Sequence, residues 1–193
     1  QRPDAIRAAL GLRYAINLYN QQRAYSNYTP KNKGIGILFG PVIIGTVGSD
    51  DRMDTTVIGD SVNIAFRLEA LAPKYNTDIV ISAQTLRQAK AEGVFEYRLL
   101  DWVRVKGRKN PIELYEIIDH QESNIKQLKL ANAKLIEQGL NYRKDQKWEL
   151  AVTHFKQALE INPEDTLAIH HLEQCAKLQE VHLAEDWDGS ILL

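Results

Sequence analysis

The sequence is short of several features that would place a 193-residue chain in a specialised class. Its single cysteine, Cys175, excludes a disulfide framework within the chain and favours a reducing compartment. The longest stretch without a charged residue, 34–49, has 16 residues and five glycines, so it is too short and too interrupted to cross a bilayer. The net charge of −1 gives no support for a nucleic-acid partner. We therefore expect a folded, cytoplasmic protein.

Methionine is equally scarce, because the only one is Met53 and the chain begins with Gln1. We interpret the sequence as a processed or cut piece of a longer protein, and membrane anchoring through the missing N-terminal region stays open. With 44% apolar and 25% charged residues, the chain has enough material for one sizeable core or two small ones.

Up to about residue 119, helical and strand-like stretches alternate, which indicates an α+β fold. In the first helix, the apolar residues at core-like spacing are Ala5, Ala8, Ala9, Leu12, Ile16 and Leu18. Two strands are expected around Gly40-Pro41, and a closing hairpin around 107–110. The predicted helices cover 3–23, 61–72 and about 83–91, and the predicted strands cover 34–40, 42–48, 78–82, 95–105 and 112–118.

Residues 51–69, DRMDTTVIGDSVNIAFRLE, carry the most informative pattern of the chain. Asp60 is a good N-cap for the helix that follows, and Pro73 ends that helix. Asn63 and Arg67 are four residues apart, so they share one helix face. An amide and a forked guanidinium near the start of a helix suit an anionic, phosphate-rich ligand. Judged by spacing alone, a solvated face is the commoner explanation, and both interpretations stay open.

The same region resembles the signature of the class III nucleotide cyclases, the adenylate and guanylate cyclase family. The matched residues are Gly40-Pro41-Val42, Gly45, Val47-Gly48-Ser49, Arg52, Asp54, Thr56 through Asp60, Val62-Asn63, Ala65 and Arg67-Leu68-Glu69. A second match, VRVKG at 103–107 followed by Pro111, Glu113 and Tyr115-Glu116, is similar to the closing hairpin of the family. The resemblance covers about residues 1–119 and implies part of a ferredoxin-like core.

The resemblance implies a role for each matched residue in converting a nucleoside triphosphate to its 3′,5′-cyclic monophosphate and pyrophosphate. Asn63 would orient the ribose, and Arg67 would stabilise charge on the phosphorus in the transition state. Lys106 would contact the triphosphate, with Arg104 as the competing candidate and solvated strand charges as the alternative for both. Thr56 occupies the position that touches the purine, which favours ATP over GTP.

In this family, two aspartates bind the Mg²⁺ or Mn²⁺ ions, and both precede the helix that 3–23 resembles. The metal ligands are therefore expected upstream of Gln1, and no metal site is expected in this chain. The family builds its active site across a homodimer, so the chain alone should be inactive. We interpret Asp50, Asp51 and Asp54 as parts of a solvated turn.

After residue 119 the apolar spacing becomes helical throughout. We expect an all-α segment over 120–183 and an extended tail over 184–193. The stretch 132–163 resembles one tetratricopeptide repeat by the offsets of Leu135, Gly139, Tyr142, Ala151, Phe155, Ala158 and Pro163. Gly139 would let two helices approach closely, and 165–183 would form a third helix.

One repeat cannot bury both of its faces, so an apolar face should be left over on the helical segment. The expected members of that face are Leu128, Leu135, Leu172 and Leu178. It could dock on the first half of the chain, on a second copy or on a protein partner, and we favour self-association. His170-His171 has no third metal ligand nearby and is expected at the surface.

Two functions of different classes remain. The first is a nucleotide cyclase in signal transduction, with the repeat as an interaction or regulatory appendage. The second is a cyclase-homology module that has lost catalysis and acts through contacts. The presence of both Asn63 and Arg67 favours the first, because an inactive domain has no physical need of them.

Overall fold

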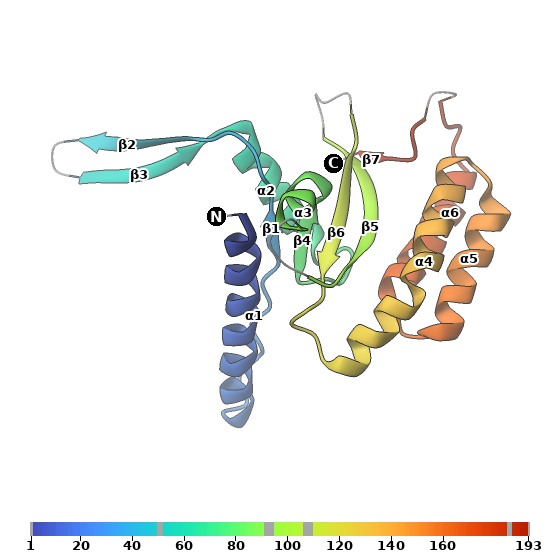
Figure 1. Ribbon diagram of the computed structural model, residues 1–193, viewed down its shortest axis with the longest axis horizontal. Helices are drawn as coiled ribbons and strands as arrows, with labels where there is room; N and C mark the ends of the chain where they lie inside the picture. Colours follow the sequence, from blue (N-terminus) through green and yellow to red (C-terminus); the bar gives the residue numbers. More distant parts are fainter. Residues whose placement is uncertain (1, 50–51, 91–94, 106–109, 185–186, 193) are drawn as a thin grey trace.

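The computed structural model describes residues 2–49, 52–90, 95–105, 110–184 and 187–192 (Figure 1). Its helices are α1 (Arg2–Tyr25), α2 (Asp60–Leu71), α3 (Ala83–Lys90), α4 (Ser123–Lys144), α5 (Trp148–Ile161) and α6 (Thr166–Gln179). Its strands are β1 (Ile35–Ile37), β2 (Ile43–Ser49), β3 (Arg52–Ile58), β4 (Ile79–Ser82), β5 (Tyr97–Arg104), β6 (Ile112–Ile117) and β7 (Ile191–Leu192). The mixed α+β pattern expected up to residue 119 is confirmed, and the helices after it are present. Among the described residues, no helix is long and apolar enough to cross a bilayer.

A five-stranded sheet in the order β1-β4-β6-β5-β7 forms the middle layer. Side chains alternate across it, so neighbouring residues of β4 enter different cores. Ile79 and Ile81 pack with Ile6 of α1 and other residues of α1 and α3 on one face. Val80 points to the opposite face, where α2 and the helices after residue 119 share one core. The sheet therefore lies between α1 and α3 on one side and α4 to α6 on the other (Figure 1).

Strands β2 and β3 form a separate antiparallel ribbon that projects away from the body (Figure 1). The two strands expected around Gly40-Pro41 thus belong to different sheets, since β1 pairs with β4 and β2 pairs with β3. Strand β1 is also shorter than expected. Its Gly36 lies directly under α2, because a Cβ there would come within 2.4 Å of the carbonyl oxygen of Ala65. This close approach fixes α2 on the edge of the sheet.

The core face of α1 differs from the predicted one. Leu12 and Leu18 are 51% and 60% exposed, whereas Ile6, Ala9 and Arg13 are the buried residues of this helix. The physical reason is that α1 contacts α3 and the sheet along a narrow stripe that includes Ile6 and Ala9, so most of its apolar residues lie outside the contact. The spacing predicted the helix correctly but not which side of it is covered.

The first two helices of the C-terminal segment pack closely against each other. A Cβ at Gly139 would lie 2.6 Å from Cε1 of Phe155, so only glycine fits where α4 crosses α5. Phe155 itself is fully buried. The close approach predicted at Gly139 is therefore confirmed by the geometry, and α6 packs against α5 as the third helix.

The apolar face of the helical segment docks on the sheet of the same chain. Leu135 and Leu172 pack against a core that includes Leu100 and Val103 of β5, while Leu128 remains 40% exposed. Of the three expected occupants of this face, the first half of the chain therefore accounts for Leu135 and Leu172, and self-association stays a prediction for the exposed Leu128. The tail is extended as expected, and its strand β7 pairs in parallel with β5.

His171 is a core residue, so its expected place at the surface is wrong, although His170 is only half-buried. Its Nε2 donates to the carbonyl oxygen of Leu100 at 2.8 Å, and its Nδ1 accepts from Arg143 at 3.2 Å. A carbonyl can only accept and a guanidinium can only donate, which fixes the neutral tautomer. Burial lowers the pKa of His171 to about 3. The surface interpretation failed because α6 packs against β5 along this side.

Candidate functional site

Helix α2 carries the two residues predicted to be catalytic, and its packing decides which way they face. Ile64, Leu68 and Leu71 are buried, so the opposite side of the helix is left at the surface. The N-cap is Gly59, without a side-chain cap, rather than Asp60 as predicted. Asp60 lies in the first turn instead, where its negative charge is favourable to the helix dipole.

Asn63 and Arg67 are both exposed and share one face of α2 through their spacing of four residues. Phe66, which lies between them in sequence, is 69% exposed. Thr56 lies in β3 opposite Gly45 of β2 and is half-buried, and the ribbon leads into α2 through Gly59. The structure therefore brings the two predicted catalytic residues together on an accessible surface at the base of the projecting ribbon.

Arg104 lies on β5, which shares a core with α2 but is not one of the strands on which α2 directly packs. Helix α2 packs on β1 and β4, and β5 is two strand positions away from β4 and three away from β1. At the usual strand spacing this corresponds to roughly 10–14 Å. Lys106, the other candidate for a triphosphate contact, lies outside the described residues. Thus the structure does not place Arg104 beside Asn63 and Arg67 within this chain.

Arg104 instead has a partner in the C-terminal tail. Its Nη2 lies 2.6 Å from Oδ2 of Asp188, and the arginine side chain remains 39% exposed. Burial raises the pKa of Asp188, but hydrogen bonds from Ser190 and Arg104 outweigh it and lower the pKa to about 2. The carboxylate is therefore ionised at any neutral pH and holds one edge of the guanidinium.

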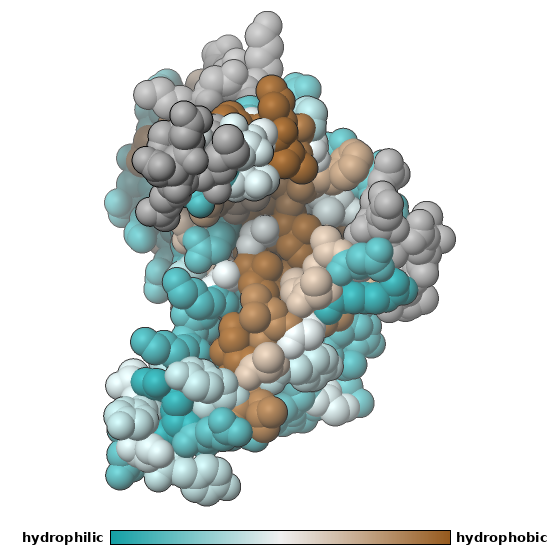
Figure 2. All heavy atoms as spheres, turned by 90° about the vertical axis from the view of Figure 1, so that its left-hand side faces the viewer, coloured by the Kyte–Doolittle hydropathy of each residue, from teal (hydrophilic) through white to brown (hydrophobic). Residues whose placement is uncertain are grey.

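Large apolar side chains are exposed on α1, on the ribbon and on α2. Figure 2 shows an apolar band on the face of the molecule toward which the ribbon projects. The large exposed apolar residues of α1, of the ribbon with the residue before it, and of α2 are Leu12, Tyr14, Leu18, Tyr19, Tyr25, Val42, Ile43, Ile44, Val57, Ile58 and Phe66. Apolar surface gathered in this way is typical of an interaction site.

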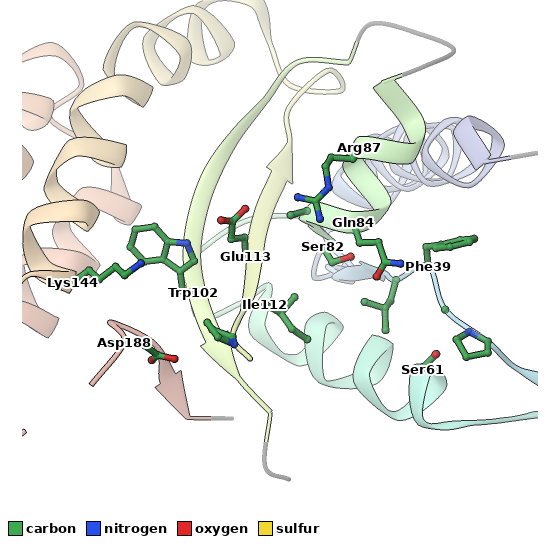
Figure 3. A pocket seen from close by; sticks show the side chains of 15 residues that line it. Phe39, Ser61, Ser82, Gln84, Arg87, Trp102, Ile112, Glu113, Lys144 and Asp188 are labelled. Atoms are coloured by element: carbon green, nitrogen blue, oxygen red, sulfur yellow. The ribbon is translucent and has the colours of Figure 1, made fainter. Parts of the chain in front are cut away.

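A cleft of about 750 Å³ extends from α2 and α3 across the sheet to the end of α4 and the tail (Figure 3). Trp102, Lys144 and Asp188 line one side, and Arg87 and Ser61 line the other. None of the described residues predicted for catalysis or substrate binding lines it. The cleft is therefore a separate feature from the accessible face of α2.

The described residues do not fit a catalytic magnesium or manganese ion. Their one cluster of potential metal ligands is Asp101, His170 and His171, whose ligand atoms lie within 4.8 Å of one another. Arg143 occupies this cluster, since it forms an ion pair with Asp101 and donates to His171. A divalent ion of this type also prefers oxygen ligands over imidazole. Asp50 and Asp51 lie outside the described residues, so the expectation about them is not tested, whereas Asp54 is exposed but lies within β3 rather than in a turn.

The comparisons with known proteins agree with the fold. The family profile described as "Adenylate and Guanylate cyclase catalytic domain" matches residues 4–119. The chain therefore belongs to the adenylate and guanylate cyclase catalytic domain family. Among solved structures, it is 30% identical to the guanylyl cyclase Cya2, with a TM-score of 0.52, covering 63% of this chain and 60% of that one. The adenylyl cyclase CyaB from P. aeruginosa is 29% identical with the same TM-score and coverage.

Curated relatives include the adenylate cyclase of Anabaena cylindrica, which is 38% identical over 118 residues, or 58% of this chain and 24% of that protein. The terminal-differentiation specific adenylate cyclase of Dictyostelium discoideum is 29% identical over 191 residues. That match covers 95% of this chain, helical segment included, and 9% of the relative. The chain thus spans less than a quarter of the length of these curated relatives.

Sequence reasoning missed the charged residues that join the sheet to the helical segment. Arg98 and Asp101 lie on β5, and both side chains are almost fully buried. The signal was present in YRLLDWVR, where two charges interrupt a run that otherwise reads as a buried strand. Such charges require partners from another element, and the helical segment supplies them.

Proposed function

We propose that this chain is the part of a class III nucleotide cyclase domain that orients the ribose and stabilises the transition state. The reaction converts a nucleoside triphosphate, with ATP favoured over GTP, to the 3′,5′-cyclic monophosphate and pyrophosphate in signal transduction. The observation that carries the proposal is the exposed pair Asn63 and Arg67 on one face of α2, in a chain that belongs to the cyclase family.

Each residue of the pair has a chemical task that suits its side chain. The ribose 3′-oxygen attacks the α-phosphorus while pyrophosphate leaves, and negative charge builds up on the phosphoryl oxygens. The guanidinium of Arg67 presents a planar fork of donors that matches those oxygens. The amide of Asn63 can hydrogen-bond the ribose and hold its 3′-oxygen in line. Thr56, half-buried in the ribbon that leads to α2, is the proposed purine contact.

The rest of the site must come from outside the described residues of this chain. Mg²⁺ or Mn²⁺ would supply charge neutralisation on the phosphates, and we propose that its ligands lie upstream of Gln1. The exposed apolar residues around α2 support a second proposal, that this face is covered by the upstream part of the domain and by the other subunit of a homodimer.

The helical segment fits a single tetratricopeptide-type repeat with a third helix. The contact between Gly139 and Phe155 supports this assignment, because such repeats bring two helices together at a small residue. A protein partner remains a proposal for the outer surface, where Leu150, Ile161 and Ile169 are exposed. The alternative function, an inactive interaction module, would need this surface but would not need Arg67.

The proposal is tested on the full-length protein that contains this chain. Purified protein is incubated with ATP or GTP and with Mg²⁺ or Mn²⁺, and the cyclic nucleotide is quantified by mass spectrometry. We expect cyclic AMP to form faster than cyclic GMP, and the 193-residue chain alone to form neither. Absence of both products from the full-length protein with either metal would support the inactive module instead.

A further inference from the structure

Three charged residues of β5 each form an ion pair with a residue that follows the cyclase family match. The pairs are Arg98 with Asp165, Asp101 with Arg143, and Arg104 with Asp188. The partners come from three different places, the start of α6, the end of α4 and the tail. One strand of the sheet is thus held along its whole length by the C-terminal segment.

The first two pairs are buried; Arg98 has several hydrogen-bond partners, whereas Nε of Arg143 is buried without one. Arg98 donates to Asp165 at 2.5 and 2.9 Å, to Glu116 at 2.5 Å and to Asn132 at 3.1 Å. A bulge between Leu99 and Asp101 shifts the register of β5 against β6. The shift puts Asp101 on the same side as Arg98, because their partners across the strands, Leu114 and Glu116, are two residues apart.

The third pair is partly exposed and lies where the tail joins the sheet. Strand β7 pairs with β5 through Val103 with Ile191 and Arg104 with Leu192. Asp188 accepts from the backbone N–H and hydroxyl of Ser190 as well as from Arg104. These bonds fix the direction of the carboxylate.

The tail is in turn fixed to the helical segment. Arg143, which pairs with Asp101, also donates to the carbonyl oxygen of Gly189 at 3.1 Å. Trp187 lies against Trp148 of α5, with ring centroids 6.1 Å apart. The position of Asp188 is thus set by α4 and α5, and through Asp188 these helices set the orientation of Arg104.

We propose that Asp188 is a positioning residue for nucleotide binding, which it serves by holding Arg104 at the end of β5. The proposal rests on the proposed cyclase function and on Arg104 as a triphosphate contact. Asp188 contacts only one terminal nitrogen of the guanidinium, and the side chain of Arg104 remains 39% exposed. Because Nε of Arg104 is buried, the part of the guanidinium left for an anionic ligand is its terminal end, where Nη1 lies beside the nitrogen that Asp188 holds. The C-terminal segment then acts as a structural part of the catalytic unit.

The test uses Asp188→Asn in the full-length protein, because this change removes the charge and keeps the shape of a side chain that is 26% exposed. We expect the KM for ATP to rise about fivefold, as for loss of a partly exposed ion pair, with kcat changed less than twofold. Asp188→Glu keeps the negative charge, so its KM should return most of the way to the wild-type value. Asp145→Asn, which breaks an exposed ion pair with Lys147, is the matched control and should change neither constant.

A second readout does not depend on activity. Amide hydrogen exchange is measured in the same proteins without nucleotide, and peptides that cover 102–105 and 191–192 should exchange several-fold faster in Asp188→Asn than in the wild type or in Asp145→Asn. If the full-length protein makes no cyclic nucleotide, the cyclase proposal fails. The exchange result then still tests whether Asp188 keeps the end of β5 and strand β7 in place. Unchanged exchange, or an unchanged or lower KM in Asp188→Asn, overturns the proposal.

Discussion

Two regions of this molecule place their polar and charged side chains in opposite environments, one exposed and one buried. On α2, Asn63 and Arg67 are exposed, and large apolar side chains such as Phe66 and Ile58 are exposed near them. At the seam between the sheet and the helical segment, Arg98 and Arg143 are as buried as the leucines around them. The first region presents functional groups on a surface, and the second uses charges to join two parts of the chain.

The difference teaches where each region finds its partners. Charges in a low-dielectric interior must be paired, and those of the seam are paired within the chain. Burial raises the pKa of Asp101, but its ion pair with Arg143 outweighs this and keeps the pKa below its ordinary value. The face of α2 has the opposite character, with reactive groups and apolar surface presented outward. Such a surface is typical of a site that another subunit or another part of the protein completes.

The largest effect should follow from breaking the seam at Arg143. Arg143→Met would leave the carboxylate of Asp101 buried without its countercharge, although Tyr75 would still donate to it at 3.0 Å. We expect the free energy of unfolding to fall by about 3–5 kcal/mol in urea denaturation. Adding Asp101→Asn should recover part of that loss. Lys147→Met, at an exposed pair, is the control and should cost less than about 1 kcal/mol.

If Arg143→Met costs no more than the exposed control, the seam is not held by its buried charges. The two regions would then differ only in how exposed their charged residues are.

A smaller effect should follow from crowding the contact between α4 and α5. Gly139→Ala places a Cβ 2.6 Å from Phe155, so we expect a loss of about 1–3 kcal/mol in unfolding free energy. Gly11→Ala in α1 is the matched control, because nothing lies within 4 Å of its Cβ. That change should stabilise the protein by about 0.5–1 kcal/mol. Equal effects of the two substitutions, measured by the same denaturation, would contradict the close packing.

The smallest effect concerns the pH dependence of stability, to which His171 should contribute and its neighbour Asp101 should not. Burial lowers the pKa of His171 to about 3, so below pH 6.5 the unfolded chain binds a proton that the folded chain does not. The free energy of unfolding should therefore fall between pH 6.5 and pH 5, with His171 alone contributing at most about 1.4 kcal/mol per pH unit. His170 contributes in the same direction, because burial lowers its pKa too. Asp101, with its pKa below 3.8, does not titrate in this window.

The measurement is urea denaturation at a series of pH values. His171→Asn should show a flatter slope of stability against pH than the wild type, and the exposed His182→Asn should keep the wild-type slope. A wild-type slope in His171→Asn would show that another group carries the pH dependence.

The sequence was informative wherever one local rule decides the outcome. The spacing of Asn63 and Arg67 predicts a shared face, and α2 has that face because Ile64 and Leu68 take the other side. Gly139 predicts a close helix contact, and Phe155 fills it. The proposed roles of Asn63, Arg67, Thr56, Lys106 and Arg104 remain predictions.

The sequence was misleading where tertiary packing chooses between equivalent options. Apolar residues occur on several sides of α1, so spacing could not tell that Ile6 is covered while Leu18 is not. A histidine pair on a helix is normally interpreted as exposed, because the sequence does not show which other element packs on it. In this structure β5 packs on His171. The pairing of Arg104 with Asp188 joins residues 84 positions apart, which no local pattern encodes.

The most direct test of the central claim is the effect of Arg67→Ala on cyclic nucleotide synthesis by the full-length protein. If the exposed guanidinium on α2 acts on the transition state, kcat should fall by roughly 10²-fold or more while the KM for ATP changes little. Arg67→Lys should recover only part of kcat, because it keeps the charge without the fork. Arg104→Ala should mainly raise the KM. A normal kcat in Arg67→Ala would contradict the account, because the face of α2 would then not be where the reaction is catalysed.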